Sequence, residues 1–211
     1  MTKRFRIMFL FAALAASLAA QQEYDLRPGD LLFQDLDCGP LCNAIEAVTE
    51  GAEGKDFSHV GMIVKAGDSL VVVEAIGEKV SLHGIAEFFA RSPKIAIGRP
   101  KEKWQTHIPM ATAQAISMVG VPYDDAFLPE NGKLYCSELL EQAWQAANGG
   151  EPFFKTPLMT FKDPNTGEFF PAWVDYFKNL GMEIPEGIPG CNPGGLSRDE
   201  KIKIIWLSGE L

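Results

Sequence analysis

The chain has 211 residues, of which 46% are hydrophobic and 22% are charged, which is a globular composition rather than a disordered or fibrous one. Its length suits a single domain with a substantial core. With 19 basic and 28 acidic residues, the formal net charge is −9. This excess of acid argues against general nucleic-acid binding, which requires clustered Lys and Arg, and against electrostatic docking onto anionic lipid.

The first twenty residues have the pattern of a secretory signal peptide. Three basic residues precede an uncharged, alanine-rich run over residues 7–20, with small residues where a signal peptidase reads. The run is short for a membrane span, and an N-terminal anchor helix is the alternative. We expect residues 1–20 to be removed and residues 21–211 to form one domain that is exported to the periplasm or the extracellular space. Loss of three positive charges changes the formal charge from −9 to −12, and no stable membrane insertion is expected.

Apolar spacing along the chain predicts an α+β protein. In chain order we expect a strand at 31–33, a helix at 41–48, strands at 59–64, 70–76, 80–82 and 95–97, and helices at 108–119 and 136–147. Residues 65–69 should form the turn of a hairpin. The tail over residues 156–196 is rich in Pro, Gly and aromatic residues, and we expect it to be ordered and to cover the core.

The predicted hairpin contains a histidine and a glutamate. Glu74 lies among Val and Ala residues, where a carboxylate is costly unless it is paired. A two-residue turn at 67–68 places Gly61 opposite Glu74, which makes Glu74 the diagonal neighbour of His59, about 7–8 Å away at Cβ. A carboxylate that accepts one imidazole N–H leaves the other nitrogen free to act as a base. The alternative is that Glu74 faces solvent and that His59 only begins a strand.

Cys136 opens the second of the long predicted helices. The positive end of the helix dipole and the free backbone N–H groups of a first turn favour a thiolate and can stabilise an oxyanion. The alternatives are a small buried residue or half of a disulfide. If Cys136 is free, Cys38, Cys42 and Cys191 form at most one disulfide. We expect no metal site, because four cysteines and three histidines lack the recurring spacing of zinc ligands. We interpret His83 and His107 as surface or internally satisfied residues.

Several segments in a fixed order resemble the YiiX/YaeF-like permuted papain-like amidases, a branch of the NlpC-type cysteine hydrolases. The four main segments are residues 27–34 (RPGDLLFQ), 57–62 (FSHVGM), 73–75 (VEA) and 135–138 (YCSE). Between the last two, residues 120–127 (GVPYDDAF) are similar to the family's Gly-x-Pro-Tyr-Asp segment. Each segment is weak by itself, but the ordered set is specific and extends over residues 27 to about 196.

The resemblance implies a circularly permuted papain-like fold, in which the histidine strand comes first and the nucleophile helix last. It implies Cys136 as the nucleophile, His59 as the general base and acid, and Glu74 as the residue that orients His59, with no cofactor. Tyr123 and Gln34 occupy family-like positions near the expected site. They are candidates for substrate binding or oxyanion stabilisation, with a packing role as the alternative.

These observations together predict a secreted cysteine hydrolase that cleaves an amide bond, with a cell-wall-type peptide as the expected substrate. One alternative is a lipid acyltransferase or thioesterase, which the resemblance also suggests and which uses the same thiol chemistry. Another is a non-catalytic binding module, against which the intact Cys, His and Glu set argues. The expected partner is therefore a small peptide, amide or acyl substrate.

Overall fold

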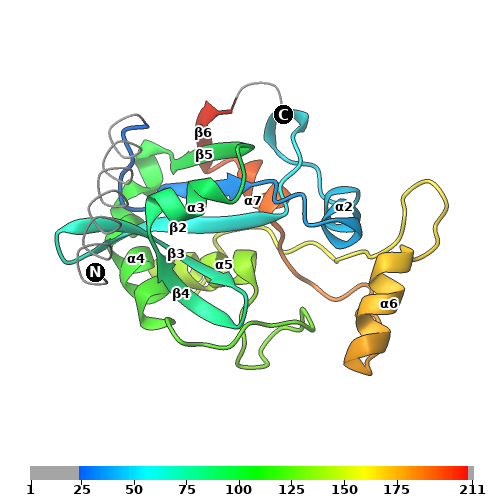
Figure 1. Cartoon of the computed structure of the whole chain (residues 1–211). Coiled ribbons are helices and arrows are strands. Elements are labelled where there is room, and N and C mark those ends of the chain that lie inside the picture. The colour runs from blue at the N-terminus through cyan, green and yellow to red at the C-terminus, as the bar shows by residue number, and fades with distance from the viewer. Residues whose placement is uncertain (1–23, 209–211) are drawn as a thin grey trace, which may run out of the picture.

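The computed structural model describes residues 24–208, and a six-stranded antiparallel sheet lies at its centre (Figure 1). The spatial order of the strands is β4-β3-β2-β1-β5-β6. The strands are β1 (Leu31–Gln34), β2 (His59–Ala66), β3 (Ser69–Ile76), β4 (Lys79–His83), β5 (Ile95–Pro100) and β6 (Ile202–Leu207). Because neighbouring strands are antiparallel throughout and helices pack on the sheet, the predicted α+β class is confirmed.

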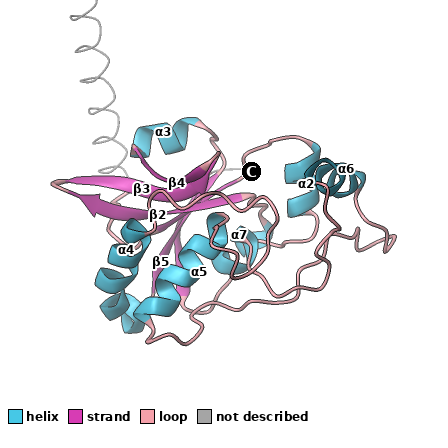
Figure 2. Ribbon diagram, turned by 90° about the horizontal axis from the view of Figure 1, so that it is seen from below, coloured by secondary structure: helices cyan, strands magenta, loops and turns pink. Residues whose placement is uncertain are grey.

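The helices cover the sheet unequally. They are α2 (Pro40–Glu46), α3 (Ile85–Ala90), α4 (Ile108–Ser117), α5 (Cys136–Ala147), α6 (Pro171–Leu180) and α7 (Pro193–Ser197), with short 3-10 turns at Ala52–Gly54 and Glu102–His107. Figures 1 and 2 show α4 and α5 on one face of the sheet and α3 on the other. Helices α2 and α6 lie together to one side of the sheet, and the two helices contact each other.

Successive side chains of each strand point to opposite faces of the sheet, so the core has one part on each face. On the first face, residues such as Phe33, Val60 and Val73 pack against the apolar side of α5, which buries Leu140 and Trp144. On the second face, apolar strand residues pack against Ile85 and Phe88 of α3. Because the core on the first face packs α5 against β2 and β3, the first residue of α5 is held close to the sheet.

The β2–β3 hairpin has the predicted register. Ala66 pairs with Ser69 and Met62 pairs with Val73, so the next pair along the ladder is Gly61 with Glu74. A side chain at Gly61 would not fit, since a Cβ there would lie 2.6 Å from Val72 Cγ1 and 3.3 Å from Glu74 Cβ. Glycine at this position therefore lets the Glu74 side chain pack closely against the strand that carries His59.

Besides the two 3-10 turns, four elements were not predicted from apolar spacing: α3, α6, α7 and β6. The proline at the first position of α6 and the left-handed Gly181 that ends it are ordinary helix boundary signals, but they stand in a tail whose aromatic content suggested an irregular covering. Instead, Phe161, Trp173 and Phe177 form a separate small core with Ala44 of α2. The tail is ordered as predicted, but its aromatic residues bury one another beside the sheet rather than over it.

The predicted signal peptide, residues 1–20, lies outside the described residues. Within residues 24–208, every helix is too short or too polar to cross a membrane.

Candidate active site

Cys136 is the first residue of α5, and the preceding loop fixes where that helix begins. The fully buried Asp124 accepts hydrogen bonds from the backbone N–H groups of Ala126 (3.0 Å) and Leu128 (2.7 Å) and from Asn131 Nδ2 (2.9 Å). Tyr135 is extended at the N-cap and its side chain makes no capping bond. The first N–H groups of a helix have no partner within the helix, so those of Cys136 and Ser137 can serve an incoming anion.

His59 and Glu74 are in direct contact. His59 Nε2 lies 2.6 Å from Glu74 Oε2, and both side chains are almost completely buried. An ionised carboxylate can only accept, so the imidazole donates from Nε2 and its Nδ1 remains for another partner. The diagonal contact that was predicted from the hairpin register is therefore confirmed.

Cys136 is the other hydrogen-bond partner of His59, so α5 and the β2–β3 hairpin meet at this pair of side chains. Burial lowers the pKa of His59, but hydrogen bonding and charge interactions with Cys136 and Glu74 outweigh it and raise the pKa from 6.5 to about 9. The imidazolium form of His59 therefore predominates at neutral pH. An imidazolium beside a thiol favours the thiolate, which is the nucleophilic form.

Two further groups around Glu74 were missed from the sequence. Arg91 Nη2 donates to both carboxylate oxygens, at 2.6 and 2.8 Å, and His83 Nδ1 lies 2.8 Å from Oε1. The β3–β4 register pairs Glu74 with Ser81, which makes His83 a diagonal neighbour of Glu74. The same kind of register argument predicted the contact between Glu74 and His59. Arg91 follows α3, a helix that was not predicted, and no sequence pattern marks it.

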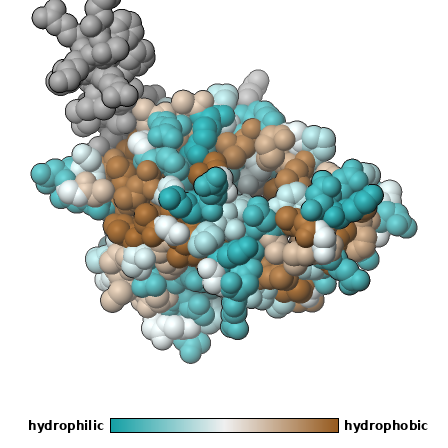
Figure 3. Space-filling view, turned by 60° about the horizontal axis from the view of Figure 1, so that its bottom comes forward, coloured by the Kyte–Doolittle hydropathy of each residue, from teal (hydrophilic) through white to brown (hydrophobic). Residues whose placement is uncertain are grey.

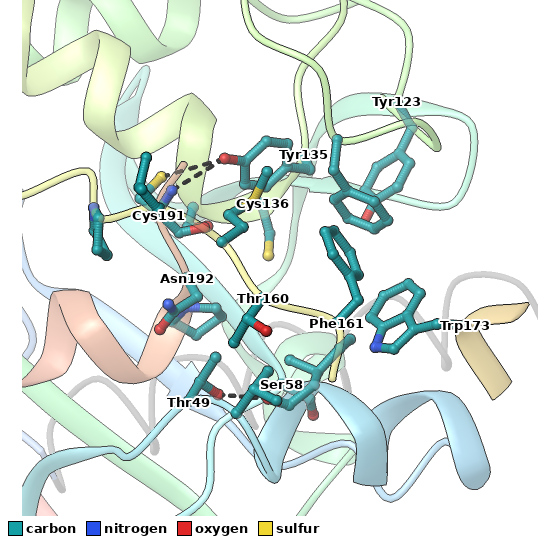
Figure 4. Close-up of a pocket in the computed structure, with 18 residues that line it drawn as sticks. Thr49, Ser58, Tyr123, Tyr135, Cys136, Thr160, Phe161, Trp173, Cys191 and Asn192 are labelled. Atoms are coloured by element: carbon teal, nitrogen blue, oxygen red, sulfur yellow. Dashed lines mark hydrogen bonds between the residues drawn. The ribbon is translucent and has the colours of Figure 1, made fainter. Parts of the chain in front are cut away.

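Tyr123 and Gln34 have different surroundings. Tyr123 lines the same cavity as Cys136 (Figure 4), and burial together with the nearby charge of Cys136 raises its pKa well above the usual value, so its hydroxyl stays a hydrogen-bond donor. Gln34 pairs with His59 across the β1–β2 ladder, and its Nε2 donates to the carbonyl of Phe88 at 2.8 Å. Gln34 is fully buried and is absent from the cavity lining, so its visible contact is with α3.

The four cysteines separate into one disulfide and two free thiols. Cys38 and Cys42 are bonded to each other at the start of α2, and neither lines the cavity, although α2 does. Cys191 is free and buried, and burial raises its pKa to about 12. Its backbone N–H donates to the Tyr135 hydroxyl at 3.2 Å, and its carbonyl accepts from Ser137 Oγ at 3.1 Å. These bonds attach the tail to the first turn of α5, directly beside Cys136.

A cavity of about 250 Å³ opens beside Cys136. Its lining is mostly apolar and is contributed by α2, by residues 157–161, by α6 and by the segment around Cys191 (Figure 4). Phe161 and Trp173 close one end. Figure 3 shows apolar surface on the α6 side of the molecule. Leu158, which lines the cavity, and Val174 of α6 are exposed. The cavity therefore offers an apolar group a place next to the thiol.

The model of the permuted papain-like amidase family YaeF/YiiX, family C92, matches the chain over residues 25–206. The chain belongs to this family. As a YaeF/YiiX-type amidase it is a cysteine hydrolase, and the match covers Cys136, His59 and Glu74. A search of curated proteins finds no significant match.

The fold of this YaeF/YiiX-type amidase is also found in a solved structure. The crystal structure of the metalloprotein YiiX from Escherichia coli O157:H7 superimposes with a TM-score of 0.70 and 21% sequence identity, over 86% of this chain and 97% of that chain. The permuted papain-like fold predicted from the sequence is thus confirmed. Within residues 24–208, no group of three or more His, Cys, Asp or Glu side chains is placed to hold a metal ion.

Proposed function

We propose that the chain hydrolyses an amide through a Cys136–His59–Glu74 triad. The observation that supports this most directly is the buried chain of contacts from Glu74 through His59 to Cys136, at the N-terminus of α5. A carboxylate, an imidazole and a thiol in that order are the groups that nucleophilic catalysis by cysteine requires. In this proposal Glu74 orients the imidazole, and its negative charge stabilises the imidazolium.

The reaction proceeds in two stages. The Cys136 thiolate attacks the carbonyl carbon, the C–N bond breaks, and imidazolium His59 gives its proton to the departing amine. This leaves a thioester on Cys136 and a neutral His59. His59 then takes a proton from water, the resulting hydroxide equivalent attacks the thioester, and the C–S bond breaks to release the acid and regenerate the thiolate–imidazolium pair.

The developing oxyanion needs hydrogen-bond donors near Cys136. The backbone N–H groups at the start of α5 have no partner within the helix and are candidate donors, and the helix dipole adds positive potential. The hydroxyl of Tyr123 is a further candidate donor, because it lines the same cavity and stays protonated. Gln34 supports His59 from the neighbouring strand in this proposal and does not contact the substrate.

The protonation of His59 predicts a limit to activity at high pH. Its folded pKa lies at about 9, above the ordinary 6.5, so the proton needed by the leaving group is held through neutral pH and lost as the pH rises through about 9. We expect kcat/KM to be flat between about pH 7 and 8 and to fall above about pH 9. Circular dichroism at each pH separates this loss from unfolding. A basic limb centred near 6.5 would contradict the proposed ion pair.

We propose a cell-wall-type peptide as the substrate, because of the export predicted from residues 1–20 and the acidic composition of the chain. An exported, acidic hydrolase meets peptide fragments of cell wall, whose amino groups an acidic surface attracts. The apolar cavity favours a second candidate, a lipid acyltransferase or thioesterase, because an acyl chain can occupy the space between Cys136 and Trp173. Both candidates use the same thioester on Cys136 and differ in what the cavity binds.

A competition experiment decides between the two candidates. The protein is incubated with a muropeptide library and with p-nitrophenyl acyl esters of increasing chain length, and Cys136→Ser is run in parallel to subtract hydrolysis that does not involve the thiol. We expect cleavage of muropeptide amides and a shallow dependence on ester chain length. No muropeptide cleavage, with kcat/KM rising steeply with acyl length, would transfer the assignment to the lipid enzyme.

A further inference from the structure

The carboxylate of Glu74 has more partners than a triad requires. Oε2 contacts His59 Nε2 (2.6 Å) and Arg91 Nη2 (2.8 Å), while Oε1 contacts Arg91 Nη2 (2.6 Å) and His83 Nδ1 (2.8 Å). The Glu74 side chain is fully buried, whereas that of Arg91 is 24% exposed. The buried carboxylate is therefore joined to the molecular surface through the Arg91 guanidinium and through the imidazole of His83, whose side chain is also 24% exposed.

We propose that Arg91 is a positioning residue for the hydrolysis, which keeps the Glu74 carboxylate ionised and turned toward His59. The inference rests on the proposed role of Glu74 and extends the triad by a fourth residue. Arg91 does not touch the reacting atoms. It acts through Glu74, and its effect must disappear when Glu74 is replaced.

Arg91 is itself held in place, which a positioning role requires. Its guanidinium carbon lies 4.9 Å from the centre of the Phe88 ring, and Phe88 is fully buried against the sheet. The carbonyl of Phe88 accepts the hydrogen bond from Gln34, which lies beside His59 on the next strand. The helix that carries Arg91 is thus attached at one end to the strand neighbouring His59, so the guanidinium has little freedom to leave Glu74.

The charges around Glu74 show why the guanidinium matters. Three groups contact Glu74 directly: His59 from β2, His83 from β4 and Arg91 from the end of α3. Two more lie behind the histidines. Glu87 of α3 is 3.9 Å from His83, and Cys136 of α5 lies beside His59. Arg91 contributes the guanidinium of this set, and it donates to both oxygens of the carboxylate. Burial raises the pKa of Glu74, but hydrogen bonds and charges from His59 and Arg91 outweigh it and lower the pKa.

The test compares Arg91→Gln and Arg91→Lys with a matched control, Arg99→Gln. Arg99 also binds a buried carboxylate, that of Asp30, through Nε (2.7 Å) and Nη2 (2.8 Å). Asp30 directly precedes β1, whereas His59 pairs with Gln34 at the other end of that strand. We expect Arg91→Gln to lower kcat by about ten- to a hundredfold with little change in KM, by analogy with the partners that orient metal-bound histidines. We also expect an acidic limb of the pH profile, where Glu74 takes up a proton and no longer orients His59. In Arg91→Gln this limb should move to higher pH, because the guanidinium that lowers the pKa of Glu74 is gone.

Arg91→Lys and Arg99→Gln distinguish an effect of the Arg91 charge from a general loss of stability. Arg91→Lys keeps the positive charge, so we expect the acidic limb to return toward the wild-type position while kcat recovers only in part. Arg99→Gln should lower the melting temperature and leave kcat and the pH profile unchanged. Rates are measured with the p-nitrophenyl ester that is cleaved best, and iodoacetamide labelling of Cys136 provides a readout that does not depend on a substrate. If Arg91→Gln lowers only the melting temperature, as Arg99→Gln does, the proposal is wrong.

A double-mutant cycle distinguishes this proposal from the proposed triad. In a Glu74→Gln background, Arg91→Gln should cost less than about twofold further in kcat, because its route of action is gone. An undiminished loss in that background would overturn the inference about Arg91. A Glu74→Gln variant that keeps wild-type activity would instead refute the role of Glu74 itself, whatever Arg91 does. Should Arg91→Gln fail to fold, the pH profile and kcat of Arg91→Lys carry the same comparison.

Discussion

Replacing Cys136 with serine should lower turnover by about 10⁴–10⁶-fold, the loss expected when the nucleophile of a catalytic triad is removed. A serine hydroxyl is far less acidic than a thiol, so the variant cannot form the thiolate–imidazolium pair on which attack by residue 136 depends. Serine is almost the same size as cysteine, and Cys136 makes no disulfide, so the melting temperature should stay close to that of the wild type. Turnover is measured with a p-nitrophenyl ester and with the best muropeptide. Activity within tenfold of the wild type would show that another residue attacks.

Thiol labelling checks the same assignment without a substrate. Limiting iodoacetamide near neutral pH, applied to fully reduced protein, should modify Cys136 first, since an imidazolium lies beside it. Cys191 is the matched control, because it is also free and lines the same cavity, but burial raises its pKa to about 12. In Cys191→Ser the labelling should be unchanged, and in Cys136→Ser it should vanish. Preferential modification of Cys38, Cys42 or Cys191 would refute the assignment.

Replacing Glu74 with glutamine should lower turnover by about 10²–10⁴-fold, by analogy with the orienting acid of other triads. The amide keeps the shape of the carboxylate but loses its charge, and its NH₂ group can donate to His59 Nε2. That hydrogen bond holds the proton on Nδ1, which is the nitrogen that faces Cys136. The charge that stabilises the imidazolium is lost as well, so the basic limb of the pH profile should move below about 9.

A neighbouring carboxylate provides the control for Glu74→Gln. Glu78 lies in the turn between β3 and β4, is exposed, and loses the same charge in Glu78→Gln, which should leave turnover unchanged. Because Glu74→Gln also removes the partner of Arg91, its melting temperature is recorded and its rates are taken well below that temperature. Turnover of Glu74→Gln within about a factor of two of the wild type would mean that Glu74 is structural.

Much of the structure followed from local patterns in the sequence. The strand that begins at His59, the register of its hairpin and the helix that begins at Cys136 depend on alternation, a two-residue turn and helical spacing, all of which are properties of neighbouring residues. The contact between His59 and Glu74 could be predicted because a hairpin register follows from its turn. The resemblance of the ordered segments then predicted the family, which the match over residues 25–206 confirmed.

Contacts between segments far apart in the chain were beyond the reach of those patterns. Arg91 reaches Glu74 only because α3 packs across the sheet, and α3 is held there by Phe88 in the core of that face. The aromatic tail pairs with α2 rather than covering the sheet, because Trp173 and Phe177 find an apolar partner in Ala44. The composition of the tail showed that these side chains needed burial and did not show where.

Local patterns predicted most of the strands, the two longest helices of the sheet's larger core and the hairpin register, and short motifs identified the three residues proposed to catalyse. Each of these depends on spacing within a few residues or on a short motif. The groups that surround those three residues depend on long-range packing: Arg91 contacts Glu74, Tyr123 and the tail lie beside Cys136, and an apolar cavity adjoins the thiol. These contacts join residues tens of positions apart, and packing of the whole chain, rather than the preference of any segment, brings them together.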